Sequence, residues 1–524
     1  MNRFVYLDNN ATTKVSEQVR DAVQEYLDLQ FGNPSSLYQH GAKVKTAINE
    51  ARENCVKLVN CASENLIFTS GGSEGNCTAF NSAIHQFQTR KRIVTTKVEH
   101  SSILEYCKLL ENRGYEVVYL DVDSDCHISA TQLEKAVNNN TCLVAIQYAN
   151  NEVGTIILTD EILRKVKELK QKYGFMFHID AVQVLGKLNI DIAKCGADFV
   201  SFSGHKVHCP KGIGMLYVAD KQNFVPLITG HQEFGLRGGT ENVLGIVAMG
   251  ESCKNIFKNL NDNNSKILEV HNYLEECLNK IGGLNINCEK AERILNTTSV
   301  TFDWCDGNNM MFALEKYGIC VSTGSACNSE SSEPSYVLTS MGVKNPQNTI
   351  RISIDETTTM SQVDYFINHL KEYREEKMRT NKNMIGGGYL LEDDKILTNE
   401  QVEILKKIDV CMLATASAKG VPHCTMVEPS RFERGRIILP VIQMVVSKQN
   451  VAENPNVFLH FYEVNPSDPL NSTQYKISAT ATLETKGELF EEIKHFEETE
   501  RLPEGLKVSG IIVAKLLKME KCVG

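Results

Sequence analysis

The chain has 524 residues, of which 23% are charged and 42% are hydrophobic. This composition is ordinary for folded proteins, and at roughly 150 residues per folding unit the length predicts about three units. The net charge of -10 and the lack of a dense Lys/Arg run argue against direct binding to nucleic acid. No apolar stretch is long enough to span a bilayer, and no export signal precedes the first strand-like run. We therefore expect a cytoplasmic protein that does not bind membranes.

The cysteines are numerous, 17 in all, yet none forms a CxxC pair and none has the Cys/His spacing of a zinc site. A large chain without an export signal is not expected to form a disulfide framework. We predict no bound metal and interpret most of the cysteines as small buried hydrophobic residues.

Up to about residue 260, helical patterns alternate with short runs rich in β-branched residues. The runs with the clearest strand character cover residues 66–70, 92–98, 116–122, 142–149 and 175–182. This alternation predicts an α/β fold, with a mainly parallel sheet and helices on both faces. Ligand sites in such sheets gather at the carboxyl ends of the strands.

After residue 260 the pattern changes to that of a smaller α+β lobe. The predicted elements are a long amphipathic helix, two strands and a closing helix, over residues 266–281, 296–302, 349–354 and 362–373. A charged, glycine-containing stretch at 374–389 is interpreted as a linker.

Residues 390–524 show a helix followed by strand runs that polar turns separate. The helix is expected at 399–408 and the strands at 410–417, 436–442, 457–463, 475–485 and 508–519. These runs predict a separate, compact β-barrel domain.

The most informative stretch is SFSGHKVHCPKGIG, at residues 201–214. A lysine in such a loop, Lys206, can form a Schiff base with an aldehyde cofactor, and Ser203 with nearby backbone amides can bind a phosphate. Surface loops of similar composition are common, so this motif alone leaves an ordinary loop as the alternative.

Other motifs at predicted strand ends favour the same chemistry. The Gly-Gly-Ser turn of FTSGGSEGN (68–76) suits phosphate binding at a helix N-terminus, and His100 in VEHSS can stack on a cofactor ring. Asp180 in FHIDAVQ could keep a pyridine nitrogen protonated, with a helix N-cap as the alternative. Asn151 in YANNEVG is a hydrogen-bonding candidate or part of a turn.

In this order the motifs resemble the NifS/IscS-like cysteine desulfurases of the class V aminotransferase superfamily, which are fold-type I enzymes that use pyridoxal 5'-phosphate (PLP). The resemblance runs from YLDNNATT (6–13) to about residue 370. Its other motifs are GNPSS (32–36), GGSEGN (71–76), EHSS (99–102), NNEVG (150–154), DAVQ (180–183), SGHKVHCPKGIG (203–214), HQEFGLRGGTEN (231–242) and GSACNSESSEPSYVL (324–338). It implies a desulfurase over residues 1–373, with a large PLP domain at about 13–260 and a small lobe made of 1–12 and 261–373.

The resemblance also implies a role for each matching residue. Lys206 would hold PLP, Asp180 would pair with the pyridine nitrogen, and His100 would stack on the ring and act as an acid/base. The remaining cofactor contacts would come from Asn151 and Gln183 at the phenolic oxygen, and from Gly72, Ser73, Ser203 and His205 at the phosphate. Thr240 would reach the phosphate from the partner subunit of a homodimer. Substrate binding is implied for Asn33, Asn151 and Arg351.

Cys327 selects one reaction among those of PLP enzymes. It lies in STGSACNSESSEPS, whose turn composition predicts an exposed loop that can carry a thiol to the substrate and away from it. The resemblance implies that Cys327 takes sulfur from L-cysteine as a persulfide, leaves L-alanine, and supplies an acceptor such as an iron-sulfur scaffold, with transient contact to a cluster. A selenocysteine lyase and a cystine-cleaving relative are the alternatives.

Three segments depart from the family pattern. TGHQEFG (229–235) replaces the usual GGGQERG, and SIDETTT (353–359) replaces a basic SLGRFTT-like run. The loop after Lys206 carries His208 and Cys209, where aromatic and glycine residues are more usual. These changes bear on partner recognition and on substrate preference.

Residues 404–520 resemble the pyridoxamine-phosphate-oxidase-like split barrels that bind FMN. The matching segments are 413–427, 445–463 and 475–492. Ser447, Lys448 and Asn450 follow a strand and are the candidates for binding the flavin phosphate, with a charged turn as the alternative. Because Pro440 and Gln443 interrupt that strand, a docking scaffold is the alternative to a flavin redox module.

Overall fold

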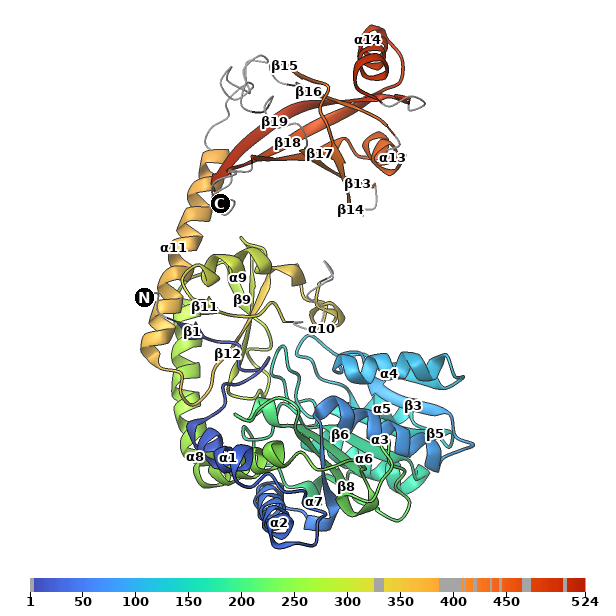
Figure 1. Cartoon of the computed structure of the whole chain (residues 1–524), viewed down its shortest axis with the longest axis vertical. Coiled ribbons are helices and arrows are strands. Elements are labelled where there is room, and N and C mark those ends of the chain that lie inside the picture. Colours follow the sequence, from blue (N-terminus) through green and yellow to red (C-terminus); the bar gives the residue numbers. More distant parts are fainter. Residues whose placement is uncertain are drawn as a thin grey trace. The chain divides into compact units, whose positions relative to one another are not determined.

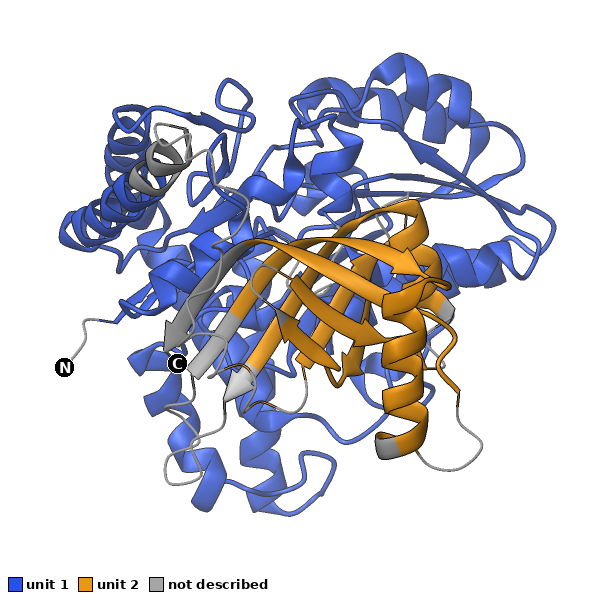
Figure 2. Cartoon of the chain, turned by 90° about the horizontal axis from the view of Figure 1, so that it is seen from above, with its two compact units in different colours: residues 1–382 blue, residues 383–524 orange. Residues whose placement is uncertain are grey.

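The computed structural model describes residues 4–324, 334–385, 405, 408, 411–417, 422–433, 436–442, 445–463, 473–502 and 507–523. The chain divides into two compact units, Met1–Lys382 and Asn383–Gly524 (Figure 2). Each unit has hydrophobic clusters of its own, so each is described by itself.

A seven-stranded sheet forms the centre of the large lobe of unit 1 (Figure 1). Its strands, in spatial order, are β2 (Leu66–Thr69), β8 (Gly214–Val218), β7 (Phe199–Ser203), β6 (Met176–Asp180), β5 (Thr141–Gln147), β3 (Arg92–Thr96) and β4 (Glu116–Leu120). Neighbours from β7 to β4 are parallel, while β8 is antiparallel to both β2 and β7. The predicted mainly parallel sheet is confirmed. Its central strands β5, β6 and β7 are buried throughout, which explains their apolar sequences.

Helices cover both faces of this sheet. They are α1 (Glu17–Asp28), α2 (Gln39–Val59), α3 (Gly72–Gln86), α4 (Ser101–Glu111), α5 (Ala130–Ala136), α6 (Asp160–Tyr173) and α7 (Ile192–Cys195). Neighbouring residues of one strand, such as Leu143 and Val144 of β5, belong to two different hydrophobic clusters. Since side chains alternate along a strand, these clusters are the cores on the two faces of the sheet.

The small lobe contains two short sheets and the helices that pack on them. The elements are the parallel pair β1 (Val5–Tyr6) and β11 (Ile319–Cys320), the antiparallel sheet β12 (Thr349–Ser353), β10 (Thr297–Phe302) and β9 (Leu284–Ile286), and the helices α8 (Val243–Asn279), α9 (Gly307–Glu315), α10 (Tyr336–Ser340) and α11 (Met360–Ile385). Val5 and Leu7 are fully buried in the core of this lobe, beside Val300 and Ile352. The N-terminal segment therefore packs with residues that follow it by about 300 positions.

Helix α8 is longer than the helix predicted at 266–281. It begins at Val243, where the Asn242 side chain accepts a hydrogen bond from the backbone N–H of Gly245. Ile246 and Cys253 lie in a core cluster of the large lobe, whereas Leu274 and Leu278 lie in that of the small lobe. One helix thus belongs to both lobes (Figure 1).

Helix α11 runs to Ile385, into the stretch at 374–389 that we interpreted as a linker. Residues 374–385 contain neither glycine nor proline and are rich in Arg, Glu, Lys and Met, which favour a helix. The first part of the predicted linker is therefore helical up to Ile385.

Unit 2 is built on a seven-stranded antiparallel sheet, which agrees with the predicted split barrel. In spatial order its strands are β14 (Pro422–Val427), β13 (Cys411–Ala416), β17 (Asn456–Glu463), β18 (Thr473–Glu484), β19 (Ile511–Val523), β16 (Arg436–Pro440) and β15 (Arg431–Glu433), and its helices are α13 (Val445–Glu453) and α14 (Glu488–Phe496). The edge strands β14 and β15 were not predicted. Most of β14 is exposed or half-buried, and a strand with so little burial leaves a weak hydrophobic signal.

The helix predicted at 399–408 falls almost entirely outside the described residues. Among the helices that the structure describes, none combines the length and the apolar character needed to cross a membrane.

Candidate active site

A cavity of about 340 Å³ lies at the carboxyl ends of β5, β6 and β7, beside the first turns of α3 and α4. Its walls bring together the predicted residues Gly72, Ser73, His100, Asn151, Asp180, Gln183, Ser203, His205, Lys206 and Arg351. Residues without a predicted role also line it, among them Asn10, Asn76, Gln147, Glu152, Gly324 and Tyr336. The predicted motifs thus converge on one cavity at the edge of the sheet where ligands are expected.

Lys206 follows β7 in a short turn, Gly204–Lys206. Its amine donates to the backbone carbonyl oxygens of Asn10 (2.6 Å) and Ala11 (2.8 Å). A Cβ added at Gly204 would lie only 2.7 Å from Cγ2 of Ile213, so the turn needs glycine there. This close packing holds the lysine against the N-terminal segment at the cavity wall.

Asp180 ends β6, and 7% of it is exposed. Its Oδ2 accepts a hydrogen bond from Nδ2 of Asn76 (2.8 Å), and its Oδ1 accepts one from the backbone N–H of Val182 (3.0 Å). The N-cap alternative is wrong, because a turn and not a helix follows β6 and the next helix is α7. The bond from Asn76 fixes the carboxylate at the cavity, where it could keep a pyridine nitrogen protonated.

His100 is the N-cap of α4, and its Nδ1 accepts a hydrogen bond from the backbone N–H of Ser102 (3.2 Å). The Ser102 hydroxyl lies 2.9 Å from the same Nδ1 and accepts a hydrogen bond from Nδ2 of Asn76 (3.0 Å). Because Nδ1 is an acceptor, the neutral ring carries its proton on Nε2. Asp180 and His100 are thus connected through Asn76 and Ser102.

Groups suited to a phosphate gather around the first turn of α3. A helix N-terminus favours an anion, and Gly72 and Ser73 begin this helix. A Cβ at Gly72 would lie 2.6 Å from Val182 Cγ2 and 3.6 Å from Ser203 Cβ, so glycine allows the close approach. Burial and the charge of Lys206 lower the pKa of His205 to about 4, so its ring is neutral at pH 7.

Gln183 and Asn10 share a network with Lys187, which was not predicted. The Lys187 amine donates to Oε1 of Gln183 (2.8 Å) and to Oδ1 of Asn10 (3.1 Å). Nε2 of Gln183 donates to the backbone oxygen of Asn10 (3.2 Å). Burial, and then the charges of Lys206 and Arg351, lower the pKa of Lys187 well below its usual range. The network fixes which end of the Gln183 amide carries its donors.

Arg351 lies on β12 and is 2% exposed. Its Nη2 pairs with Oδ1 of Asp8 (2.6 Å), and its Nη1 donates to the backbone oxygens of Asn151 (3.1 Å) and Gly324 (3.2 Å). Its Nε has no hydrogen-bond partner among the described residues. A buried guanidinium held in this way is suited to a substrate carboxylate.

Three predicted residues are not brought into the cavity. Thr240 lines a separate hollow of about 230 Å³ with Ser70 and Arg237, and Asn33 is exposed, with its Oδ1 bonded to the Ser35 backbone N–H (2.9 Å). Cys327 lies outside the described residues, although Gly324, three positions earlier, lines the cavity.

Two of the segments that depart from the family pattern meet in the structure. Nε2 of His208 lies 3.4 Å from Oε2 of Glu356, and its Nδ1 lies 2.9 Å from the backbone oxygen of Lys14. Asp355 is close enough for the three side chains to form a potential metal-ligand group among the described residues. The pair joins the loop after Lys206 to the segment that follows β12, the strand that carries Arg351.

In unit 2, Ser447, Lys448 and Asn450 lie in helix α13 rather than in a turn. The Ser447 hydroxyl is fully buried and has no hydrogen-bond partner among the described residues. Nδ2 of Asn450 donates to Oγ1 of Thr415 (3.1 Å), and Nζ of Lys448 donates to the backbone oxygen of Ser509 (3.2 Å).

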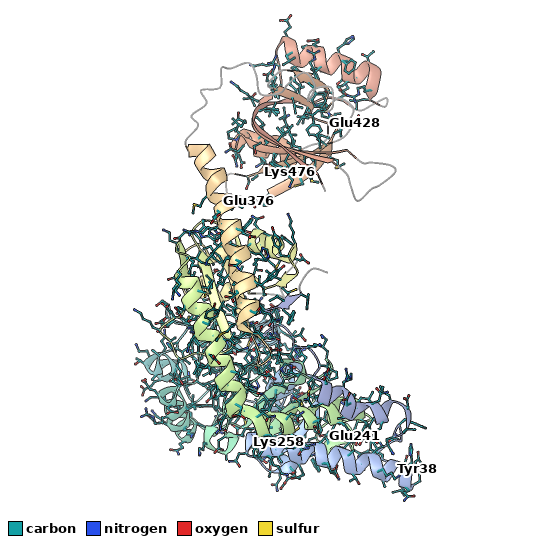
Figure 3. All side chains as sticks on the ribbon, turned by 90° about the vertical axis from the view of Figure 1, so that its left-hand side faces the viewer. Tyr38, Glu241, Lys258, Glu376, Glu428 and Lys476 are labelled. Carbon is teal, nitrogen blue, oxygen red and sulfur yellow. The ribbon has the colours of Figure 1, made fainter. Side chains whose placement is uncertain are left out.

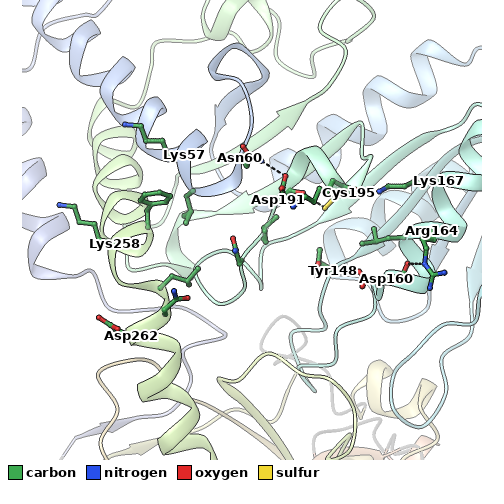
Figure 4. A pocket seen from close by; sticks show the side chains of 18 residues that line it. Lys57, Asn60, Tyr148, Asp160, Arg164, Lys167, Asp191, Cys195, Lys258 and Asp262 are labelled. Atoms are coloured by element: carbon green, nitrogen blue, oxygen red, sulfur yellow. Dashed lines mark hydrogen bonds and ion pairs between the residues drawn. The ribbon is translucent and has the colours of Figure 1, made fainter.

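A larger cavity, of about 870 Å³, lies elsewhere in unit 1, among α2, α6, α7 and α8 (Figure 4). Its charged side chains include Lys57, Asp160, Arg164, Lys167, Asp191, Lys194, Lys258 and Asp262. None of the predicted catalytic residues lines it. Size alone therefore does not locate the chemistry.

The fold and the smaller cavity define the class of PLP-dependent enzymes of fold type I. Residues 5–366 match the family model described as Aminotransferase class-V, and the chain belongs to that family. Residues 397–517 match the model described as Pyridoxamine 5'-phosphate oxidase, in agreement with the split-barrel fold of unit 2.

Similar proteins narrow the class further. A cysteine desulfurase from Nostoc sp. is 42% identical over 374 residues, which cover 70% of this chain and 92% of the relative. The cysteine desulfurase NifS of Azotobacter vinelandii is 36% identical over 368 residues, which cover 69% and 90%. A solved NifS-like protein matches with a TM-score of 0.66 and 34% identity, over 71% of this chain and 100% of its own. Unit 1 is thus a cysteine desulfurase, an enzyme that depends on PLP.

Proposed function

We propose that the enzyme converts L-cysteine to L-alanine and transfers the sulfur to Cys327 as a persulfide. The observation that carries this proposal is the position of Gly324 in the wall of the cavity that holds Lys206, Asp180 and Arg351. Cys327 follows Gly324 by three residues, and a chain extends at most about 3.6 Å per residue, so the two Cα atoms are at most about 11 Å apart. A connection of this length allows the thiol to reach the substrate.

The residues of the cavity fit PLP. A volume of about 340 Å³ is in the range of small-molecule sites, and the buried Asp180 carboxylate and the glycine-lined first turn of α3 suit a pyridine nitrogen and a phosphate. Lys206, Asp180, Asn151, Gln183, Ser73, Ser203 and His205 would hold the cofactor. When bound, PLP supplies an electron sink that makes the Cα proton of the substrate acidic.

Different side chains of the protein carry out the separate steps of the reaction. Arg351 orients the substrate carboxylate, Nζ of Lys206 takes the Cα proton, and His100 moves a proton to or from the thiols. Sγ of Cys327 attacks the substrate sulfur as a thiolate, so that an S–S bond forms while the Cβ–S bond breaks with its electron pair on carbon. A proton then completes the methyl group of L-alanine, Nζ of Lys206 returns a proton to Cα, and no outside oxidant is required.

The test is the replacement Cys327→Ser. We expect loss of sulfide release and of the persulfide, while L-cysteine still changes the visible spectrum of the bound cofactor. Lys206→Ala is the matched control and should lose both signals. Sulfide release at the wild-type rate from the Cys327→Ser protein would contradict the assigned nucleophile.

We further propose a homodimer in which Thr240 completes the phosphate site of the partner. Thr240 lies outside the cavity of its own chain, and Phe31, Leu37 and Tyr38, which precede α2 in the sequence, are all more than half exposed. Figure 3 shows Tyr38 at the beginning of this helix. Such a group of exposed apolar side chains is typical of a protein contact. Mixing Lys206→Ala and Thr240→Val chains should restore activity that each lacks alone, and no recovery would contradict the exchange.

The acceptor that the persulfide chemistry and the NifS-like relatives favour is an iron-sulfur scaffold in the cytoplasm. With L-cysteine, ferrous iron and a thiol reductant that converts the persulfide sulfur to sulfide, the enzyme should assemble a cluster on such a scaffold, as followed by absorbance, and the Cys327→Ser protein should not. Cluster assembly that proceeds equally with the variant would contradict the role.

For unit 2 we propose FMN binding at α13. The support is the buried Ser447 hydroxyl without a partner among the described residues, together with the match to the pyridoxamine-phosphate-oxidase family. Purified protein should take up FMN, and Ser447→Ala should weaken that uptake. Absence of flavin uptake by the wild type would leave unit 2 as a docking scaffold.

A further inference from the structure

Glu152 lies in the turn after β5 and its carboxylate is buried in the cavity wall. Its Oε2 accepts a hydrogen bond of 2.5 Å from the hydroxyl of Ser335. Ser335 is itself buried and is the N-cap of α10, where its Oγ accepts the backbone N–H of Leu338 (3.2 Å). The carboxylate thus fastens the start of α10 to the active site.

The same carboxylate also packs against Gly324. A Cβ added at Gly324 would lie 2.7 Å from Oε2 of Glu152, and the residue has a φ of +104°, so only glycine fits there. Nη1 of Arg351 donates to the Gly324 carbonyl oxygen (3.2 Å) and so holds the residue from its other side. Gly324 is therefore fixed between Glu152 and the arginine proposed to bind the substrate.

Gly324 and Ser335 flank the sequence that carries Cys327. We propose that Glu152 is a positioning residue for sulfur transfer, which holds both ends of this sequence at one carboxylate beside the substrate site. The proposal rests on Cys327 as the sulfur acceptor. It adds a residue that is not among those proposed to hold the cofactor, and whose role is to bring the thiol to the substrate sulfur.

The energetics support a specific role for the charge. Burial raises the pKa of Glu152, and only the Ser335 hydrogen bond and the charge of Arg351 oppose that effect. A buried carboxylate is a costly way to pack a turn, since an apolar side chain of similar size would avoid desolvation. What the carboxylate provides, and an apolar side chain would not, is a hydrogen-bond acceptor for Ser335 next to Gly324.

The test separates the two halves of the reaction. In Glu152→Gln and in Ser335→Ala, the L-cysteine-dependent change in the cofactor spectrum should keep its rate within about twofold. The rate of persulfide formation on Cys327, followed by mass spectrometry, should fall about 10- to 100-fold, because a small displacement of a reacting group costs that much. The double variant should be no slower than the slower single variant, since both changes break the same contact.

Thr339→Val is the matched control, because Thr339 lies in α10 but its hydroxyl donates only to the Ser335 backbone oxygen (2.8 Å). A deficit in this control equal to that of Ser335→Ala would assign the effect to the helix and overturn the role of Glu152. Persulfide formation within twofold of wild type in both test variants would overturn it as well. If Glu152→Gln does not fold, Ser335→Ala alone decides. A wild-type protein that forms no persulfide on Cys327 would instead reject the proposed function.

Discussion

The active-site cavity and the larger cavity among α2, α6, α7 and α8 both carry many charged side chains, but they hold them differently. In the active site, Asp180 and Arg351 are 7% and 2% exposed and bond to residues far away in the sequence. In the larger cavity, the Lys194 side chain is 83% exposed and pairs with Asp191, three positions earlier. Water screens the second kind of charge, so reactivity follows from desolvation and fixed orientation rather than from volume.

The largest effect is expected at Asp180. Asp180→Asn removes the charge that would stabilise a protonated pyridine nitrogen, while the amide can still bond to the Val182 backbone through its oxygen. Turnover of L-cysteine should fall by about 100-fold or more, as happens when a preorganised electrostatic group is removed. The PLP content of the purified variant is the control, since turnover must be compared per bound cofactor. Turnover within tenfold of wild type would contradict the assigned partner of the ring.

A smaller effect is expected at the partly exposed pair of His208 and Glu356. Burial disfavours the charged form of each group, but the hydrogen bond and opposite charge of its partner favour that form more strongly. The pKa of His208 is therefore raised above 6.5, and that of Glu356 is lowered below 4.5. The histidine contributes stability below pH 6.5 and loses it as pH rises through its raised pKa. The carboxylate contributes above pH 4.5 and loses its part as pH falls through its lowered pKa.

The two windows overlap between about pH 4.5 and 6.5, where Glu356→Gln should cost most. With side chains that are 18% and 28% exposed, the loss should be at most about 1 kcal/mol, or roughly 1 to 2 °C in the thermal midpoint of unit 1. Calorimetry at pH 5.5 and pH 8.5 measures the difference. Glu276→Gln is the control, because its partner Lys280 stays charged at both pH values. An equal loss at both pH values for Glu356→Gln would contradict the pairing.

The smallest effect is expected in the larger cavity. Lys194→Ala removes an exposed ion pair and leaves the active site unchanged, so turnover and KM should stay within about twofold of wild type. Steady-state kinetics decide the matter. A clear loss of turnover would show that the larger cavity takes part in the reaction. It would contradict the distinction drawn between the larger cavity and the active-site cavity.

Sequence motifs predicted many of the residues that line the active-site cavity, because they lie at the ends of strands that have a clear sequence signal. Asn76, Glu152 and Lys187 lie within or beside the same motifs, yet their roles depend on side chains that come from distant elements. The residues around Asn76 in the sequence do not indicate that its side chain donates hydrogen bonds to both Asp180 and Ser102. The sequence thus predicted residues that line the cavity, and did not predict the residues that hold another side chain in place.

The same reasoning applies to the fold. Buried strands such as β5 have a strong apolar signal and were predicted, whereas the edge strand β14 has little buried surface and was not. The length of α8 was missed because its first turns pack in one lobe and its last turns in another, so no single apolar stripe runs along it.

Helix α8 also has a mechanical consequence. At about 1.5 Å per residue its 37 residues form a rod of roughly 55 Å, anchored in a different core at each end. Bending an unbroken helix would break some of its backbone hydrogen bonds, so a hinge between the two lobes is not expected within α8. Lys206 lies in the large lobe and Arg351 in the small lobe. A continuous helix that packs in both cores therefore opposes a bending motion that would change the distance between these two side chains.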